Sequence, residues 1–582
     1  MENYQYNITN IQFKNTFSMK PNQINVFVGA NNCGKTQLLK DMLSYITGQK
    51  NDFILLDKLD VTYPENWETL QKRYKFQIVK DRHGNDLLRH ISPMLDGSPS
   101  LSIISDLNNT LNNWLKCNRQ QFRNATGSGF VTFLNTDNRL KLAMSQSVKN
   151  LQKEGAKNVL ESLYESGKEA TQKVRQIIMD IFNLDIYLDT SNLGMLQFKI
   201  GIDFSKISDN SQIAYSQLNH YPLLDIQGDG IRSAIGIISA IIAVKKPVIL
   251  LDEPEAFLHP PQAIKLGGVI SKLVDDTQQI FISTHSVDFL KGLLGSTREA
   301  TIIHLNRKLN DEIEVKVLNS DILNSIITDP LLSSSRVLEG MFYKGVVATE
   351  GDADTTFYQR LFQKVNSSDE IHFVNAHNKQ TLKKLIEPYK ILGIKFAMIA
   401  DIDVIRDIHE FKSLINISSD EQLKKQIIND RNIIYNFFHN QNKHKTLCKL
   451  YEETKKLTSE QLPSVDADSN EIDSRISEFR LSLKKIREES DELANLKKDG
   501  YYSLREDLQK TCENLLINCA SIGLFIVKVG ELESWLIDYG IQRTFNKSKW
   551  ISSALNKLYE IEYDETKEIW KFIIELKNYL IS

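Results

Sequence analysis

Residues Gly29–Thr36 (GANNCGKT) match the pattern G-x-x-x-x-G-K-[ST] in full. Glycines in this pattern let backbone N–H groups turn inward around phosphate oxygens, and the helix that follows directs its positive end toward the same anion. Lys35 would contact the β- and γ-phosphates, and Thr36 would offer its hydroxyl to Mg²⁺. The pattern therefore predicts an ATP site, and the residues expected to line it are Gly29, Asn31, Asn32, Gly34, Lys35 and Thr36.

Two later apolar runs end in polar residues that suit the same chemistry. Pro247–Asp252 (PVILLD) is followed directly by Glu253, and Gln279–Ser283 (QIFIS) leads into His285. Asp252 would hold Mg²⁺ through water, and Glu253 would polarise the attacking water. A carboxylate pair that simply ends a strand is the plain alternative, but it leaves the histidine unexplained. Because ligands bind at the carboxyl ends of parallel strands, we expect His285 to contact the γ-phosphate.

A second group of carboxylates lies in the C-terminal half. Glu350 ends the run GVVATE, and Asp401 and Asp403 follow the run KFAM. The alternation of side chains along a strand would place the two aspartates on one face, and a glutamate at the tip of a neighbouring strand would complete a cluster. Such a cluster favours Mg²⁺ or Mn²⁺, which prefer oxygen ligands. Two such ions roughly 4 Å apart activate water and stabilise a leaving 3′ oxygen.

The elements that must position these residues alternate between strand and helix. Short apolar runs at 24–29, 247–252 and 279–283 are typical of buried parallel strands, and helical patterns separate them. A new α/β pattern begins near residue 344, with strands expected in 345–350, 395–401 and 523–528. The sequence therefore predicts an α/β fold with an ATPase head at 1–54 and 216–335, and a second domain at 340–405 and 521–582.

Two long stretches remain between these parts. Residues 55–215 are mostly helical in pattern, most clearly at 101–117 and 145–182, and are expected to form a helical insertion in the head. This insertion is either a plain helical subdomain or an arm for dimerisation or partner binding. Residues 406–520 are dense in Lys and Glu with apolar residues at helical spacing, so we expect a solvated helical hairpin inserted in the second domain.

Composition places few further limits on function. The 582 residues have a net charge of −3, with 41% hydrophobic and 25% charged residues, as in ordinary globular proteins. The five cysteines have no spacing suited to zinc and fit a reducing compartment. The N-terminus does not resemble a signal peptide, and the longest apolar stretch is too short to span a membrane. We therefore expect a cytoplasmic protein.

The order of the nucleotide motifs resembles that of the ABC/SMC/RecF-like ATPases. In that group a signature loop precedes the second motif, and Gln227–Ser233 (QGDGIRS) is similar to it, with Gly230 and Arg232 as its candidate contacts to nucleotide. The resemblance implies a homodimer with ATP bound between two facing heads. The GDGIR form resembles the variant found in overcoming-lysogenization-defect (OLD) nucleases.

The carboxylates that follow resemble a TOPRIM domain, which occurs in topoisomerases, primases and OLD-family nucleases. The glutamate in E-G-x-x-D and the later D-x-D are that domain's hallmark, and an ATPase ahead of them is similar to the OLD family, including the Gabija-system nuclease and retron-associated OLD effectors. The resemblance implies further metal ligands, Asp354 and Glu533. It also implies a lysine that stabilises the charged phosphate, for which Lys528, Lys547 and Lys549 are open candidates.

The resemblance implies an ATP-regulated, Mg²⁺-dependent endonuclease that cuts DNA, with a role in bacterial defence against phage. Two alternatives stay open. The nuclease could act on RNA, or be directed by a partner such as a helicase or a retron reverse transcriptase with its nucleic acid. The chain could also be a DNA-binding ATPase scaffold without catalysis, although the retained carboxylates favour an enzyme.

Overall fold

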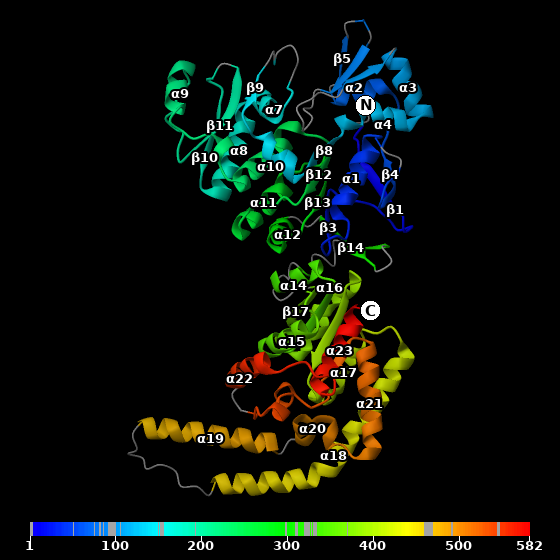
Figure 1. Cartoon of the computed structure of the whole chain (residues 1–582), viewed down its shortest axis with the longest axis vertical. Helices are drawn as coiled ribbons and strands as arrows, with labels where there is room; N and C mark the ends of the chain where they lie inside the picture. The colour runs from blue at the N-terminus through cyan, green and yellow to red at the C-terminus, as the bar shows by residue number, and fades with distance from the viewer. Residues whose placement is uncertain are drawn as a thin grey trace. The chain divides into compact units, whose positions relative to one another are not determined.

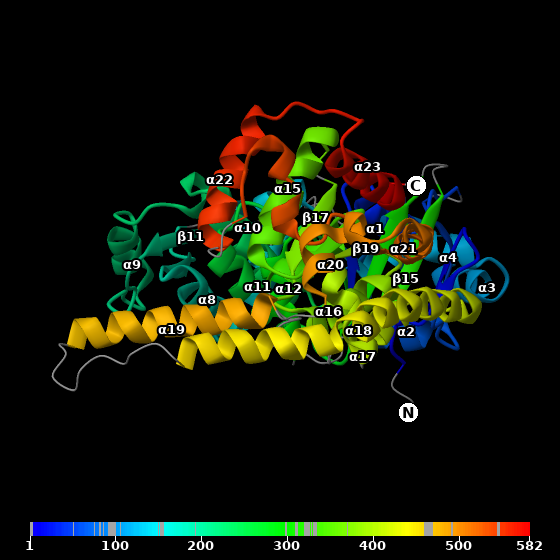
Figure 2. The same cartoon turned by 90° about the horizontal axis from the view of Figure 1, so that it is seen from below.

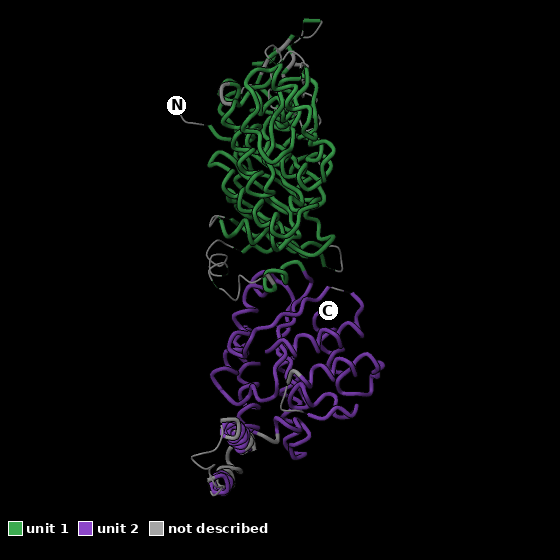
Figure 3. The backbone as a smooth tube through the Cα atoms, turned by 90° about the vertical axis from the view of Figure 1, so that its left-hand side faces the viewer, with its two compact units in different colours: residues 1–342 green, residues 343–582 purple. Residues whose placement is uncertain are grey.

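The computed structural model describes residues 4–581 except 50–51, 75, 81–82, 85, 91–100, 105, 149–150, 152–155, 193, 297–299, 309–311, 319–325, 327–328, 330–334, 369, 459–468, 490–492 and 544–546. The chain divides into two compact units, residues 1–342 and 343–582 (Figure 3). Each unit is built on its own parallel sheet, so the predicted α/β fold is confirmed. Among the described helices, none combines the length and the apolar character that crossing a bilayer requires.

The first unit is built on a six-stranded sheet of order β15-β14-β3-β13-β12-β8. All neighbouring strands are parallel except the pair β14 and β15 at one edge. Strands β3, β12 and β8 are buried along their whole length, as expected for a sheet covered on both faces. Their bounds are β3 Ile24–Val28, β8 Val131–Leu134, β12 Val248–Asp252, β13 Gln279–Ser283, β14 Ala300–Arg307 and β15 Ile313–Leu318.

Helices cover both faces of this sheet. Figure 1 shows α1 (Lys35–Ile46) on one side and α10 (Asp229–Val244), α11 (Pro260–Leu273) and α12 (Val287–Leu294) on the other. Leu38, Leu39 and Met42 of α1 belong to one core with apolar residues from the strands. A small antiparallel sheet, β2-β1-β4, adds to the same core; its strands are β1 Ile8–Phe13, β2 Ser18–Met19 and β4 Leu56–Val61.

The structure corrects the predicted helical insertion at residues 55–215. This stretch contains β4, which pairs with β1, and β8, which forms an edge of the head sheet. The predicted helix 101–117 is a strand, β7 (Leu101–Ile104), followed by α3 (Leu107–Cys117). Short apolar runs such as VTFL and LSII cannot be assigned to strand or helix by periodicity alone, because they span about one helical turn.

The other secondary structure of this stretch is mixed. The predicted helix 145–182 divides into β9, α7 and α8, and Gly167 opens α8 with a positive φ of 86°. The remaining elements are α2 Trp67–Tyr74, β5 Phe76–Lys80, β6 Asp86–His90, α4 Arg119–Thr126, α5 Thr136–Leu142, β9 Gln146–Ser147, α7 Val159–Glu165, α8 Gly167–Phe182, β10 Asp185–Asp189, β11 Met195–Gly201 and α9 Ser211–Leu218.

The second unit is built on a four-stranded, fully parallel sheet of order β17-β16-β18-β19. Three strands, β16 (Gly345–Thr349), β18 (Lys395–Ala400) and β19 (Leu524–Ile526), lie where the sequence predicts them. The fourth strand, β17 (Ile371–Asn375), was not predicted. Helices α15 (Asp352–Val365), α22 (Lys547–Glu560) and α23 (Glu568–Ile581) share one core with the sheet, which includes the buried rings of Trp550 and Trp570.

The stretch between β18 and β19 is helical where it is described. Its two longest helices, α18 (Glu421–Thr458) and α19 (Ser469–Glu489), lie side by side (Figures 1 and 2). Shorter helices α17 (Ile408–Ile415), α20 (Ala494–Asp499) and α21 (Glu506–Ser521) connect this pair to the sheet. The inserted segment therefore leaves the sheet directly after the D-x-D residues and returns to it at β19.

Two helices of the first unit pack backbone against backbone. A Cβ atom on Gly292 of α12 would lie 1.9 Å from the carbonyl oxygen of Ile264 in α11, and one on Gly267 of α11 would lie 2.3 Å from that of Phe289. Both distances are far shorter than van der Waals contact.

We therefore expect Gly292→Ala to lower the free energy of unfolding of the first unit by about 1–3 kcal/mol, measured by urea denaturation. Gly228→Ala is the control, because a Cβ there meets no atom within 4 Å. A Gly292→Ala variant with the free energy of unfolding of wild type would contradict this close packing.

Candidate nucleotide and metal sites

The loop between β3 and α1 has the backbone that the phosphate motif requires. Gly29 and Gly34 have positive φ angles of 142° and 98°, and Asn32 has a φ of 63°. A Cβ on Gly29 would lie 2.3 Å from the carbonyl oxygen of Leu305, so only glycine fits. The Lys35 ammonium lies inside the loop and donates to the carbonyls of Gly29 (2.8 Å) and Ala30 (3.0 Å). Burial lowers the pKa of this lysine, so an anionic phosphate would stabilise its charged form.

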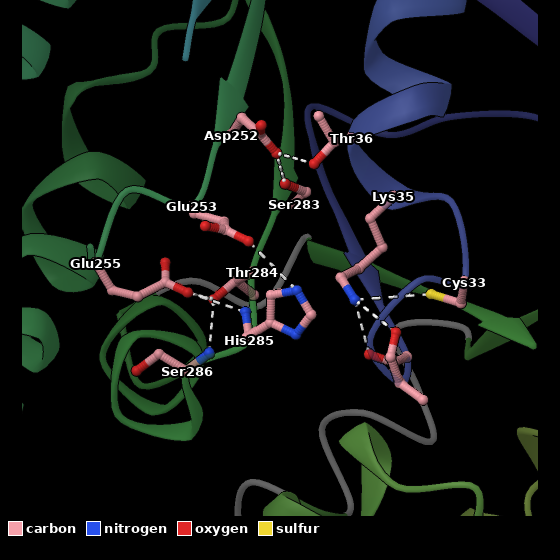
Figure 4. Close-up of polar contacts among 12 residues, drawn as sticks. Cys33, Lys35, Thr36, Asp252, Glu253, Glu255, Ser283, Thr284, His285 and Ser286 are labelled. Carbon is pink, nitrogen blue, oxygen red and sulfur yellow. Dashed lines mark hydrogen bonds and ion pairs between the residues drawn. The ribbon is translucent and has the colours of Figure 1, made fainter. Parts of the chain in front are cut away.

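Asp252 links two strand ends and the start of a helix in the nucleotide site. Its carboxylate accepts hydrogen bonds from Thr36 Oγ1 (2.9 Å) and from the hydroxyl of Ser283 (Figure 4). Thr36 opens α1, while Asp252 and Ser283 end the neighbouring strands β12 and β13. The residues predicted to share Mg²⁺ therefore contact each other directly, and their oxygen atoms are suitable ligands for that ion.

Glu253 and His285 also lie together at this edge. Their side chains are 3.3 Å apart, from Nε2 to Oε1 (Figure 4). Burial and the nearby charge of Lys35 lower the pKa of His285 to about 4, so the imidazole is neutral near pH 7 and the contact is a hydrogen bond. Glu253 has a positive φ of 47°, which is unfavourable for a residue with a side chain. Such strain persists only where surrounding contacts hold it.

Two residues that the sequence did not single out as site residues supply these contacts. Arg139 of α5 is fully buried, and its guanidinium donates to the carbonyl oxygens of Asp252 and Glu253 (2.7 Å for Glu253). Glu255 accepts from Thr284 Oγ1 (2.8 Å) and from the backbone N–H of His285 (2.9 Å), and burial raises its pKa. Arg139 thus holds the backbone at Asp252 and Glu253, and Glu255 holds the backbone at His285.

The predicted signature loop begins α10. A Cβ on Gly230 would lie 2.5 Å from the carbonyl oxygen of Phe257, so the loop packs closely against the segment that follows β12. Arg232 pairs with Asp229 in the first turn of α10. The contact expected of Gly230 and Arg232 is with nucleotide on a second, facing chain, and it stays a prediction.

The second site lies at the carboxyl edge of the parallel sheet in the second unit. Glu350 follows β16 and Asp401 follows the neighbouring strand β18, and the backbone N–H of Asp401 donates to Glu350 Oε1 (3.3 Å). Asp403 lies in the short turn η4 (Ile402–Ile405), beyond the end of the strand, so strand alternation does not explain its position. Burial raises the pKa of Glu350 to about 7, and the negative charges of Asp403 and Asp354 contribute to this shift.

Lysines lie among these carboxylates. Lys379, at the start of α16 (Lys379–Ile391), pairs with Asp403 and lies 3.8 Å from Glu350 Oε1. Lys497 of α20 lies 3.4 Å from Asp403 Oδ2 and 3.8 Å from Glu531 Oε2. Burial alone would raise the pKa of Asp403. The positive charges of Lys379, which has the larger effect, and of Lys497 outweigh burial and hold that pKa below its usual value. Neither lysine was predicted as a site residue. Lys379 lies 24 residues before Asp403 and Lys497 lies 94 residues after it, and no local sequence pattern connects positions so far apart.

The residues that the family resemblance implied lie in several places. Asp354 of α15 is buried near Glu350, and Glu531, which belongs to the same short motif as Glu533, pairs with Lys497; the ligand role expected of Glu533 stays a prediction. Lys528 is engaged elsewhere: it pairs with Glu568 (3.1 Å) and lies over the ring of Tyr501. Lys547 begins α22, but its side chain lies outside the described residues, and Lys549 is exposed on the same helix.

The donor set suits a hard divalent cation, although the cluster is not arranged around one. Among the described residues, no three acidic, histidine or cysteine side chains are gathered closely enough to hold a metal ion. Ammonium groups lie between the carboxylates instead. Burial is the main cause of the raised pKa of Glu350, and a divalent cation bound beside this carboxylate would stabilise its charged form and lower that pKa.

Comparison with known proteins gives two family matches. Residues 102–290 match a family described as an AAA ATPase domain, and residues 341–403 match the overcoming lysogenization defect protein-like TOPRIM domain. The Old nuclease of Escherichia phage P2 is 26% identical over 295 residues, which are 46% of this chain and 47% of that protein. The chain thus spans about half the length of this relative.

Solved structures give weaker matches. An SMC head bound to the C-terminal winged-helix domain of ScpA has a TM-score of 0.32, and the SMC head domain from Thermotoga maritima has one of 0.29. Both are 12% identical and cover 54% of this chain and 98% of theirs. The likeness therefore depends on the two domains and their order: a match to an AAA ATPase domain is followed by a match to the OLD-like TOPRIM domain, and the relative matched over about half of its length is an Old nuclease.

Proposed function

We propose that this chain is a divalent-metal-dependent endonuclease that cuts DNA, and that nucleotide in its head controls the cutting. The observation that supports this most strongly is that Glu350 and Asp401 follow two adjacent parallel strands, with Asp403 in the short turn beyond the second, and that one lysine ammonium lies beside both Glu350 and Asp403. Carboxylates at one sheet edge repel each other without cations, and they offer the oxygen ligands that Mg²⁺ and Mn²⁺ prefer. The matched relative carries the name nuclease, which agrees with this proposal.

In this proposal, Glu350 and Asp403 hold the cation, with Asp401 and Asp354 beside them. A bound divalent cation would activate water and stabilise charge on the scissile phosphate. Glu350 enters this role only when it is deprotonated, because a protonated carboxyl is a poor metal ligand. Positive side chains around the carboxylates, Lys379, Lys497 and Arg543, would attract the nucleic-acid backbone.

The head would bind ATP with Mg²⁺ through Lys35, Thr36 and Asp252. Glu253 would orient the attacking water and His285 would contact the γ-phosphate, which the 3.3 Å contact between their side chains supports. Head-to-head dimerisation, with Gly230 and Arg232 facing the nucleotide of a second copy, is part of this proposal. The defence role against phage and any directing partner stay predictions from the family.

The nuclease proposal predicts the outcome of a plasmid cleavage assay. Glu350→Gln and Asp403→Asn remove metal ligands, so we expect each to lower the rate of nicking of supercoiled plasmid, with Mg²⁺ or Mn²⁺, by roughly 100-fold or more. Glu370→Gln is the matched control, because Glu370 pairs with Lys344 before β17, away from the carboxyl edge. Cleavage of RNA but not of plasmid would favour the RNA-directed alternative. Equal rates for Glu350→Gln and wild type would rule out this site.

Replacing Arg139 tests the positioning of Glu253. Arg139→Met leaves the buried carbonyls of Asp252 and Glu253 without their donor, so we expect ATP hydrolysis to fall by roughly 10- to 100-fold. Binding of a fluorescent ATP analogue should persist, because Lys35 and Thr36 are unchanged. Arg175→Met is the matched control, since that arginine pairs with Asp185 outside the site. Phosphate release at the wild-type rate would show that Arg139 does not position the glutamate.

A further inference from the structure

Lys379 lies between the two carboxylates that are proposed to hold metal. Its ammonium pairs with Asp403 Oδ1 and lies 3.8 Å from Glu350 Oε1. The lysine is the first residue of α16, which follows β17, so it approaches the carboxyl edge of the sheet from the strand beside β16. One ammonium group of the chain itself therefore lies beside both carboxylates.

The position of this ammonium conflicts with metal binding. A divalent cation bound by Glu350 and Asp403 must lie between them, where the Lys379 ammonium lies in this structure. Two cations cannot share that place, because they repel each other strongly at such short distances in a partly buried site. The long, unbranched side chain at the first turn of a helix can rotate away, and 22% of it is exposed to solvent.

Lys497, the other lysine beside Asp403, belongs to helix α20, whose backbone packs closely against the segment after β19. A Cβ on Gly530 would lie 2.2 Å from the carbonyl oxygen of Lys497, and one on Gly500 would lie 2.1 Å from that of Lys528. The backbone N–H of Tyr501 also donates to the carbonyl of Lys528 (2.9 Å). This close packing fixes α20 against the segment after β19. The Lys497 ammonium lies on Asp403 Oδ2, whereas that of Lys379 lies on Oδ1 and near Glu350, so Lys497 does not take the place between the two carboxylates.

We propose that Lys379 is a resident counter-ion of the nuclease centre, which occupies the metal position between Glu350 and Asp403 and is displaced when a divalent cation binds. Lys379 is thus a positioning residue: without metal it keeps the two carboxylates together, and with metal it moves out of their way. This inference depends on the proposed function, since it takes the same two carboxylates as metal ligands.

The test measures Mn²⁺ binding and thermal stability, not cleavage. Lys379→Met removes the competing cation, so calorimetric titration with Mn²⁺ should give a dissociation constant at least about tenfold lower than wild type. In metal-free buffer the variant should unfold at a lower temperature, because the carboxylates repel each other, and Mn²⁺ should raise that temperature more than it does for wild type. Lys379→Arg, which keeps the charge, should bind Mn²⁺ like wild type.

Lys344→Met is the matched control, because Lys344 pairs with Glu370 away from the carboxylates and its loss should leave Mn²⁺ binding unchanged. If Lys379→Met folds poorly without metal, Lys379→Gln takes its place in the titration. Wild-type affinity in both variants, with binding still abolished by Glu350→Gln, would overturn the counter-ion role and leave the proposed nuclease intact. If Glu350→Gln does not change Mn²⁺ binding at all, the metal site and the proposed function fail together.

Discussion

Negative charge gathered at the ends of parallel strands must be compensated, and this requirement shapes both sites. In the first unit, Asp252 ends β12 and Glu253 and Glu255 follow it. Thr36 and Ser283 donate hydrogen bonds to Asp252, and Thr284 donates one to Glu255. In the second unit, Glu350 and Asp403 are compensated by lysine ammonium groups. Removal of a partner would leave a partly buried carboxylate that strongly favours a new cation.

The two sites differ in how firmly the groups that compensate the carboxylates are held. In the nucleotide site, hydroxyls and a backbone N–H donate to the carboxylates of Asp252 and Glu255, and a fully buried guanidinium holds the backbone carbonyls of Asp252 and Glu253, so these groups are held before any ligand binds. The second site depends on long lysine side chains from separate helices. One of these helices, α20, belongs to the segment inserted between β18 and β19, which therefore contributes Lys497 to the carboxylate cluster.

The strands and the motifs at their ends could be predicted from the sequence because they are local patterns. An apolar run followed by a carboxylate identifies β12, β16 and β18 without any knowledge of the rest of the chain. The partners could not be predicted in this way: Arg139 lies 113 residues before Asp252, and Lys497 lies 94 residues after Asp403. Their roles follow from tertiary packing, which single-sequence patterns do not contain.

The errors have the same origin. The short strands β7 and β8 lie in a stretch that was predicted to be mostly helical, because runs of only four residues have no distinct period. Asp403 was placed by strand alternation, although β18 ends at Ala400 and a tight turn orients the aspartate. Glu531 and Glu533 lie in one short motif, and only the fold determines that Glu531 is the one that pairs with Lys497, while the ligand role expected of Glu533 stays a prediction.

The central claim is that the carboxylates at the edge of the second sheet form a divalent-metal centre. The most direct test is anomalous X-ray diffraction from crystals of the full chain grown with Mn²⁺. We predict an anomalous peak within about 2.5 Å of carboxylate oxygens of Glu350 and Asp403. Crystals in which Mn²⁺ binds only at other places, with no peak at these two residues, would contradict the account.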